Sequence, residues 1–261
     1  MSIDDQPLRG IVVGLGTMGS HHLRVLQSLP GAQVVAVADP QAARRDAALQ
    51  TDPRLAAHES LTEALEAHSP DFACLAVPVA ELPAAARTAL AAGAHVLVEK
   101  PMAPTEDEAA DLMRAAREQS LAVGVGYVER FNPAVAALKA QLDEGVIGPI
   151  VQLHARRLSP FPNRASMLGV ALDLATHDID VMRYQTGSEV ARVFAETARP
   201  LGEAGEDLIC ATLRFDSEAT GVLETNWVTP TKVRQLSVTG EHGMLVVDYL
   251  TQDLFLYEHP T

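Results

Sequence analysis

A glycine-rich run near the N-terminus has the residue types and spacing of a dinucleotide-binding turn. Gly14, Gly16 and Gly19 form a GxGxxG pattern that follows an apolar stretch and opens a helical pattern. The first glycine permits a tight turn, the second lets backbone approach a pyrophosphate, and the third lets the helix pack closely with its N-terminal amides toward the anion. The alternative is a glycine turn without a ligand, but the flanking strand and helix favour a dinucleotide site.

Asp39 lies 20 residues after Gly19, at the end of the second apolar stretch. A carboxylate at this place accepts hydrogen bonds from the adenosine ribose hydroxyls and repels a 2′-phosphate. The sequence therefore predicts NAD as the cofactor in preference to NADP, although Arg44 and Arg45 follow closely. The other predicted cofactor contacts are Thr17, Met18, Val77, Pro78, Glu99 and Lys100.

Lys100 belongs to the tripeptide Glu99-Lys100-Pro101, which ends a further apolar stretch. Ligands of open parallel sheets bind outside the carboxyl ends of the strands, so a lysine here can reach a nicotinamide and its substrate. The alternative is a solvated surface lysine.

A second chemical pattern is the spacing of Asp173, His177, Asp180 and Tyr184, which places them on one face of a predicted helix. The other positions of this helix are mostly apolar, so the polar stripe needs partners or a wet cavity. Asp173 can fix the tautomer of His177 and raise its basicity. The alternative is an Asp–His pair with a purely structural role at a domain junction. No metal is predicted, because a lone DxxxH is a poor zinc-binding set.

Arg156, Arg157 and Arg164 are the densest basic cluster of the chain. Such a cluster can hold a diphosphate through bidentate hydrogen bonds. The alternative is an exposed strand with solvated arginines.

The elements that must position these residues change in character along the chain. Residues 1–140 contain 31 alanines and residues 141–261 only 10. In the first part, apolar strands alternate with helices, which is typical of a parallel sheet covered on both faces. The predicted strands are Gly10–Gly14, Gln33–Ala38, Phe72–Val77, His95–Glu99 and Leu121–Val125, and Thr105 with Glu108 forms a capping box for a helix that ends near Gln119.

The second part begins with a predicted helix at Pro133–Glu144, a strand at Ile150–Arg157 and a long helix from Gly169 to Tyr184. Strands joined by short links follow, and such links favour antiparallel pairing. They cover Glu189–Ala198, Asp207–Phe215, Ala219–Val228, Lys232–Thr239, Met244–Tyr249 and Asp253–Tyr257. The predicted fold class is α/β: an N-terminal Rossmann domain with a doubly wound parallel sheet, then a C-terminal α+β domain with a mostly antiparallel open sheet.

Composition excludes several classes of protein. The 261 residues include 20 basic and 34 acidic side chains, a formal charge of −14 that argues against nucleic-acid binding. Cys74 and Cys210 both lie in apolar stretches and are predicted to be buried free thiols of a reducing compartment. The acidic N-terminus lacks the pattern of a signal peptide, and no apolar run reaches the ~20 residues of a membrane span. We therefore expect a cytoplasmic protein without a membrane partner.

Three motifs in order resemble the Gfo/Idh/MocA (glucose-fructose oxidoreductase/inositol dehydrogenase) family: the GxGxxGxxH run that ends at His22, the EKP tripeptide at Glu99, and Asp173-xxx-His177-xx-Asp180. The resemblance implies an NAD-binding Rossmann domain over residues 1–125 and a substrate-binding and oligomerisation domain over residues 126–261. It implies Lys100, Asp173 and His177 as catalytic residues, and a homodimer or homotetramer formed through the C-terminal sheet. Relatives usually continue past the position of Thr261, so the C-terminus is expected to be shortened.

Two further stretches, Tyr127–Pro133 and Arg156–Arg164, look like the branch of the family that contains UDP-N-acetylglucosamine 3-dehydrogenases. The substrate contacts implied are Arg130, Asn132, Arg156, Arg157, Arg164 and Asp180. The implied reaction is oxidation of a secondary hydroxyl of a sugar, namely the 3-hydroxyl of UDP-N-acetylglucosamine, with either His177 or Lys100 as the base. Three alternatives stay open: a dehydrogenase of inositol or another sugar or cyclitol, a non-catalytic nucleotide-binding sensor, and a reductase of a non-sugar carbonyl on the same scaffold.

Overall fold

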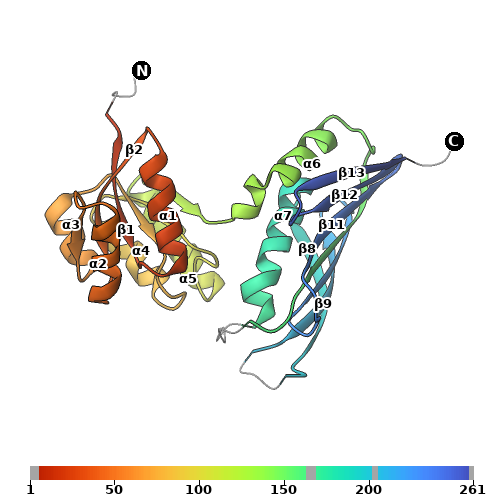
Figure 1. Ribbon diagram of the computed structural model, residues 1–261. Coiled ribbons are helices and arrows are strands. Elements are labelled where there is room, and N and C mark those ends of the chain that lie inside the picture. The colour runs from red at the N-terminus through yellow and green to blue at the C-terminus, as the bar shows by residue number, and fades with distance from the viewer. Residues whose placement is uncertain (1–5, 163–168, 202–204, 259–261) are drawn as a thin grey trace. The chain divides into compact units, whose positions relative to one another are not determined.

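The computed structural model describes residues 6–162, 169–201 and 205–258. The chain divides into two compact units, one ending at Gly126 and the other beginning at Tyr127. Figure 1 shows the first unit in red to yellow-green and the second in green to blue.

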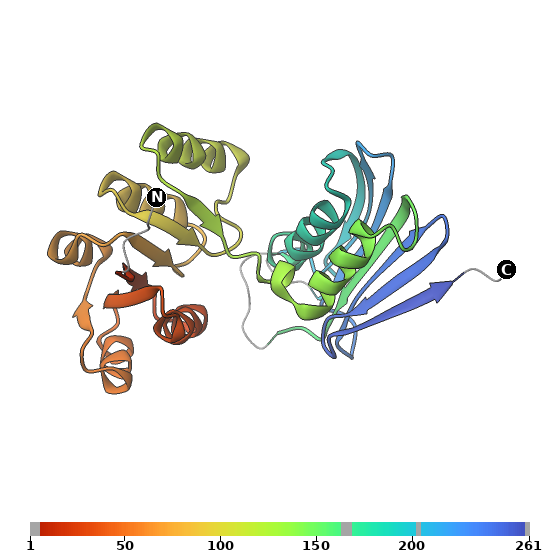
Figure 2. The same cartoon turned by 90° about the horizontal axis from the view of Figure 1, so that it is seen from above.

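The N-terminal unit is a six-stranded parallel sheet with helices on both faces (Figures 1 and 2). Its strand order is β3-β2-β1-β4-β5-β6, so the chain reverses direction across the sheet between β1 and β4. The strands are β1 (Leu8–Val13), β2 (Ala32–Ala38), β3 (Ala56–His58), β4 (Phe72–Leu75), β5 (His95–Val98) and β6 (Val123–Val125). The helices are α1 (Thr17–Ser28), α2 (Ala42–Thr51), α3 (Leu61–His68), α4 (Leu82–Ala91) and α5 (Glu106–Glu118). The predicted Rossmann architecture is confirmed.

Local sequence signals explain how these helices begin. The Thr105 hydroxyl accepts a hydrogen bond from the amide of Glu108 at 3.3 Å, which confirms the predicted capping box of α5. The sequence analysis missed β3 and α3. Ser60 caps α3 by accepting from the amide of Glu63 at 3.3 Å, so the same S-x-x-E signal was present there.

The C-terminal unit is built on a seven-stranded sheet with the order β13-β12-β11-β7-β10-β9-β8. Its strands are β7 (Ile150–Leu158), β8 (Val190–Ala198), β9 (Leu208–Phe215), β10 (Thr220–Asn226), β11 (Val233–Gly240), β12 (Gly243–Asp248) and β13 (Asp253–Glu258). β7 and β10 pair in parallel, and the other neighbours pair antiparallel. The predicted mostly antiparallel sheet is confirmed.

Helices cover one face of this second sheet (Figure 2). They are the 3-10 turn η1 (Val128–Phe131), α6 (Pro133–Asp143), the π-helical turn η2 (Ala171–Ala175) and α7 (Thr176–Thr186). Buried side chains alternate along the strands, as with Leu153 and Ala155 of β7, which belong to the core between sheet and helices. The intervening side chains lie on the opposite face, which we call the open face of the sheet.

The predicted helix from about Gly169 to Tyr184 is confirmed, and its first part is a π-helical turn, Ala171–Ala175, that leads into α7. One prediction about the cysteines needs correction. Cys210 is exposed, whereas Cys74 is buried as predicted. Cys210 pairs in register with Glu224 and Glu196 on the open face, so the alternation of β9 directs it away from the core.

Within the described ranges, no helix is long and apolar enough to cross a membrane.

Candidate active site

The glycine-rich turn joins β1 to α1, and glycine occupies each of its three positions for a different structural reason. Gly14 has a φ of +82°, and a Cβ there would lie 2.6 Å from the carbonyl oxygen of Ala76. A Cβ at Gly19 would lie 1.6 Å from the carbonyl oxygen of Gly14, so only glycine lets α1 pack this closely. A Cβ at Gly16 would meet no protein atom within 4 Å. Open space at the second glycine, beside the N-terminus of α1, fits the approach of a pyrophosphate.

Thr17 and Met18 are the first two residues of α1, and both are exposed. They belong to the first turn of the helix, the end toward which a helix attracts an anion. Their contact with the cofactor's diphosphate stays a prediction.

Asp39 follows β2, and its side chain links the turn after β1 to the turn after β2. One carboxylate oxygen accepts from the amide of Leu15 at 2.7 Å and the other from the amide of Gln41 at 2.8 Å. Burial acts to raise the pKa of Asp39, but these amides and the Arg44 guanidinium lower it below its ordinary value. The side chain is therefore an ionised acceptor in the position expected for the ribose contact, although the residue is only 2% exposed.

Arg44 and Arg45 both turn toward Asp39. Arg44 donates to the carboxylate at 3.3 Å, and Arg45 donates to the Asp39 carbonyl oxygen at 2.7 Å. Because the two arginines are engaged with Asp39 itself, they reinforce a binding arrangement centred on a carboxylate.

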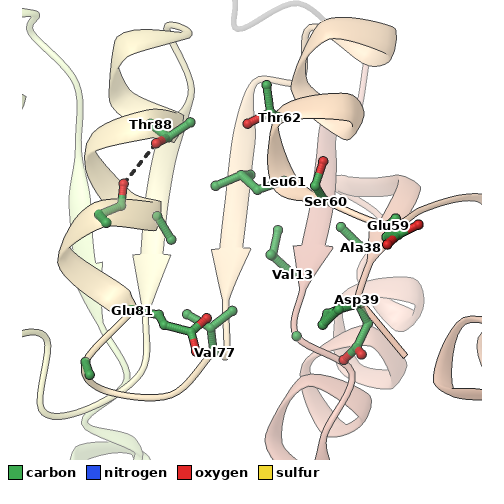
Figure 3. Close-up of a pocket in the computed structure, with 15 residues that line it drawn as sticks. Val13, Ala38, Asp39, Glu59, Ser60, Leu61, Thr62, Val77, Glu81 and Thr88 are labelled. Atoms are coloured by element: carbon green, nitrogen blue, oxygen red, sulfur yellow. Dashed lines mark hydrogen bonds between the residues drawn. The ribbon is translucent and has the colours of Figure 1, made fainter. Parts of the chain in front are cut away.

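A pocket of about 510 Å³ opens beside Asp39 (Figure 3). It is bounded by the ends of β1 and β2, by the segment after β4, and by α3 and α4. Its polar lining includes the carboxylates of Asp39, Glu59 and Glu81, and its floor is apolar. Val77, which was predicted from the sequence, lines this pocket, and Pro78 follows it at the start of the turn into α4. An apolar slot with acceptor groups fits an adenine and its ribose, whose N6 and hydroxyl groups are donors.

Glu99 and Lys100 follow directly after β5, at the carboxyl edge of the same sheet. Glu99 accepts a hydrogen bond from Nε2 of His22, on α1, at 2.6 Å, and both side chains are largely buried. Hydrogen bonds of His22 with Cys74 and Glu99 outweigh burial and raise the pKa of His22 to about 10. His22 was recognised in the sequence only as the end of a motif, and no role was predicted for it.

In the C-terminal unit, Asp173 lies in the π-helical turn and His177 in the first turn of α7, and both are half-buried. Glu206 holds the start of this segment, because its backbone and side-chain oxygens accept from the amides of Val170 and Ala171 at 2.9 and 3.0 Å. π-Helical turns are frequent at functional sites. Lys100 belongs to the N-terminal unit, so its partnership with Asp173 and His177 stays a prediction.

Asp180 is buried on α7 and binds Arg130 of η1 through two hydrogen bonds of 2.8 and 2.5 Å. The Arg130 guanidinium also lies 5.8 Å from the ring centre of Tyr127 and 5.3 Å from that of Tyr184. Asp180 and Tyr184 thus share one helix face, as their spacing predicted. Asn132 caps α6 by accepting from the amide of Ala134 and donates to the carbonyl oxygen of Tyr249.

The predicted arginine clamp for a diphosphate is wrong in its central pair. Arg157 is 4% exposed and faces the helices, where it binds Asp178 in a bidentate manner at 2.7 and 2.9 Å and Glu129 at 2.9 Å. Burial disfavours its charge, but these carboxylates hold the pKa of Arg157 above its ordinary value.

Arg156, the next residue of β7, lies on the open face and binds Glu224 of β10 at 3.1 Å. Because successive side chains of a strand point to opposite faces, Arg156 and Arg157 cannot hold one diphosphate together. Arg164 lies outside the described residues. Glu129 and Asp178, which neutralise Arg157, were missed because nothing local in the sequence indicates a pairing between distant elements. Within the described ranges, no group of three metal-ligating side chains comes together.

A parallel sheet with a glycine turn, an ionised Asp39 and Lys100 at its carboxyl edge, followed by a separate mostly antiparallel unit, defines a two-domain dinucleotide-binding protein. Family comparison gives the same division: residues 8–127 match the oxidoreductase family with an NAD-binding Rossmann fold, and residues 135–246 match the GFO/IDH/MocA C-terminal domain. The chain belongs to the Gfo/Idh/MocA family of oxidoreductases.

Curated relatives include two kinds of dehydrogenase. The chain is 28% identical to the UDP-N-acetylglucosamine 3-dehydrogenase of Acidithiobacillus ferrooxidans over 96% of its own length and 77% of that protein. It is 33% identical to an inositol 2-dehydrogenase of Streptomyces avermitilis over 81% of its own length and 63% of that protein. The chain thus spans 63% to 77% of the length of these two relatives.

Solved structures give the same picture. The UDP-N-acetylglucosamine 3-dehydrogenase of Acidithiobacillus ferrooxidans superposes with a TM-score of 0.86 at 28% identity, covering 97% of this chain and 80% of that one. An NAD-binding protein from Listeria innocua superposes with a TM-score of 0.89 at 25% identity, covering 98% and 75% of the two chains.

Proposed function

We propose that this protein oxidises a secondary hydroxyl of a sugar or cyclitol with NAD as the hydride acceptor. The observation that carries the proposal is the combination, in one unit, of the glycine turn, the carboxylate of Asp39 and a lysine directly after β5. Open space at Gly16 and the pocket beside Asp39 fit the diphosphate and the adenosine of the cofactor. Asp39 and the neighbouring Glu59 and Glu81 favour NAD over NADP, because a 2′-phosphate would meet three carboxylates.

The chain's own residues supply binding and proton transfer in this proposal. The cofactor, when bound, would supply the electrophilic ring for hydride transfer. Lys100 hydrogen-bonds the substrate oxygen, and either Lys100 or His177 takes the hydroxyl proton. Asp173 orients His177 and stabilises its protonated form.

For the particular substrate we propose the 3-hydroxyl of UDP-N-acetylglucosamine, which yields the 3-keto sugar nucleotide and NADH. Support comes from the similarity to a dehydrogenase of that name over nearly the whole chain. Inositol is the second candidate, and two observations favour it: the 33% identity to an inositol dehydrogenase, and the engagement of Arg156 and Arg157 with carboxylates of the protein itself.

The test is the appearance of NADH when the protein is incubated with NAD+ and a panel that contains UDP-N-acetylglucosamine, myo-inositol and free hexoses. We expect turnover with the nucleotide sugar, and a loss of at least about 100-fold in kcat for Lys100→Ala, the range typical of a lost acid–base group. Turnover with myo-inositol alone would overturn UDP-N-acetylglucosamine as the substrate, but it would support the assignment as a sugar or cyclitol dehydrogenase. Tight NADH binding without turnover on any member of the panel would favour the non-catalytic sensor.

We further propose that copies of the chain associate through the open face of the C-terminal sheet, as a homodimer or homotetramer. A cytoplasmic location stays a prediction from the N-terminal sequence and the two cysteines.

A further inference from the structure

The His22–Glu99 pair connects two elements that are distant in the sequence. His22 lies in the second turn of α1, and Glu99 follows β5 directly. In the sheet, β4 lies between β1 and β5, so the histidine reaches across β4 and its residue Cys74 to meet the glutamate. The separation of Nε2 and Oε1 is 2.6 Å, and the two side chains are 17% and 12% exposed.

Close packing of α1 makes this reach possible. A Cβ at Gly19 would collide with the Gly14 carbonyl oxygen and would lie 3.5 Å from the side chain of Ala76, which follows β4. The glycine therefore lets the helix approach β4, and the next turn of the helix carries His22 toward the carboxyl end of β5.

Glu99 is held from several directions. Its Oε1 accepts from His22, and its Oε2 accepts from the backbone amide of Lys100 at 3.3 Å. Gly126 packs against the same carboxylate, because a Cβ there would lie 3.3 Å from Oε1. The backbone at Lys100 is therefore tied to a carboxylate that is itself tied to α1.

The charges of His22 and Glu99 keep the two side chains paired throughout the neutral pH range. Because the pKa of His22 is raised to about 10, the ring carries a proton throughout the neutral range. A partly buried ion pair is screened less by salt than a surface pair. Removing one partner leaves the other charge uncompensated, which costs more free energy than the pair itself contributes.

We propose that His22 is a positioning residue for Lys100: by clamping Glu99, it fixes the backbone after β5 relative to α1. The proposal rests on the proposed function, in which Lys100 meets the substrate and the N-terminus of α1 takes the cofactor's diphosphate. The ion pair of His22 and Glu99 then holds Lys100, which meets the substrate, at a fixed position relative to the helix end that binds the cofactor.

The test compares His22→Leu, His22→Gln and Glu99→Gln with wild type and with His21→Leu, a control on the same helix with an exposed side chain. Three quantities are measured: kcat on the active substrate, the Kd of NADH from fluorescence titration, and hydrogen exchange of the peptide that contains Lys100. The first two separate a misplaced Lys100 from a lost cofactor site, and the third needs no turnover.

We expect His22→Leu and Glu99→Gln to lower kcat by about 10- to 100-fold, the cost of a small misplacement of a reacting group. In His22→Leu the Kd of NADH changes less than about threefold; this readout is not applied to Glu99→Gln, because Glu99 is itself a predicted cofactor contact. Exchange at Lys100 becomes faster in both variants and stays unchanged in His21→Leu. His22→Gln, which keeps a neutral donor, recovers part of kcat.

A wild-type kcat in His22→Leu, or unaltered exchange at Lys100, would overturn the proposal. A loss confined to NADH affinity would assign His22 to cofactor binding and equally overturn it. If wild type turns over no substrate, the proposed function fails, whereas the exchange data still decide whether His22 orders the backbone at Lys100. If His22→Leu does not fold, kcat and the exchange at Lys100 in Glu99→Gln decide the proposal, because this change exchanges one heavy atom and keeps the side-chain volume.

Discussion

At the scale of single residues, His22 acquires a charge that its type alone does not give it at neutral pH. Its side chain forms a partly buried ion pair with Glu99, and the hydrogen bonds with Cys74 and Glu99 raise its pKa from 6.5 to about 10. The folded protein therefore binds this proton more tightly than the unfolded chain does.

This shift predicts how stability depends on pH. Because the folded pKa lies above the unfolded one, the stabilisation is complete below about pH 6.5 and is lost as the pH rises through 10. We expect wild type to exceed His22→Leu in its urea midpoint most at pH 6, and the difference to shrink steadily toward pH 10. Midpoints of both proteins over this range measure the effect. A difference that is constant with pH would show that His22 contributes packing rather than charge.

Arg156 and Arg157 show what single residues in a sequence do and do not reveal. Their clustering predicted an anion site, and the structure instead gives each a carboxylate of the protein. That they face opposite sides was available from the sequence, because Ile150–Arg157 was predicted as a strand and strands alternate. That Arg157 meets Asp178 was not, because the pairing joins β7 to α7 and depends on how the helix packs on the sheet.

At the scale of elements, local signals predicted most of the N-terminal unit. Apolar strands, the glycine turn and the Thr105 capping box are each determined by residues that are close together in the sequence. Each was found where it was expected. β3 is only three residues long and half-buried, so it has no apolar pattern long enough to predict a strand. The π-helical turn at Asp173 could not be predicted either, because Glu206, which holds its start, lies 35 residues further along the chain than Ala171.

The turn between β1 and α1 offers a test at this scale, because two of its glycines have different surroundings. Gly19→Ala places a methyl against the Gly14 carbonyl oxygen, so we expect a lower melting temperature and at least about tenfold weaker NADH binding, since α1 must shift from the diphosphate. Gly16→Ala meets no protein atom, so we expect wild-type melting but weaker NADH binding. Thermal melting and NADH fluorescence titration measure both effects.

Gly31→Ala is the matched control for these variants. A Cβ there also meets nothing within 4 Å, and the residue lies in the turn before β2, away from the pocket beside Asp39. It should match wild type in both measurements. Normal melting of Gly19→Ala, or normal NADH binding by Gly16→Ala, would contradict the roles that the structure gives to these glycines.

At the scale of the whole molecule, each unit has its own core. Among the described residues, the buried apolar clusters of the first unit lie between Ile11 and Ala116, and that of the second between Ala134 and Tyr249. The break in alanine content therefore coincides with a change of core: small side chains fit between helices and a parallel sheet, and larger ones fill the space between the second sheet and its helices.

The open face of the second sheet lacks such a cover within the described residues (Figure 2), and this leads to the last prediction. Phe194, Phe255 and Tyr257 lie on it with 68%, 48% and 53% of their surface exposed. Phe194 lies on β8 and the other two on β13, so aromatic side chains are exposed at both edges of the open face. Exposed aromatic side chains favour association with a partner, and the same face of a second copy can pair with this one about a two-fold axis. We expect light scattering to give a mass of two or four times the 27.8 kDa chain.

Neighbouring residues of β8 provide the variant and its control. Phe194 pairs with Thr212 on the open face, whereas Val193, 59% exposed, pairs with Leu213 on the side of the helices. A lysine on the open face would bury an uncompensated charge between two copies, so Phe194→Lys should lower the mass to that of one chain. Val193→Lys adds the same charge one residue earlier and on the opposite face, so it should leave the mass unchanged. If Val193→Lys dissociates the assembly and Phe194→Lys does not, the copies associate through a different surface, and the exposed aromatics of the open face need another explanation.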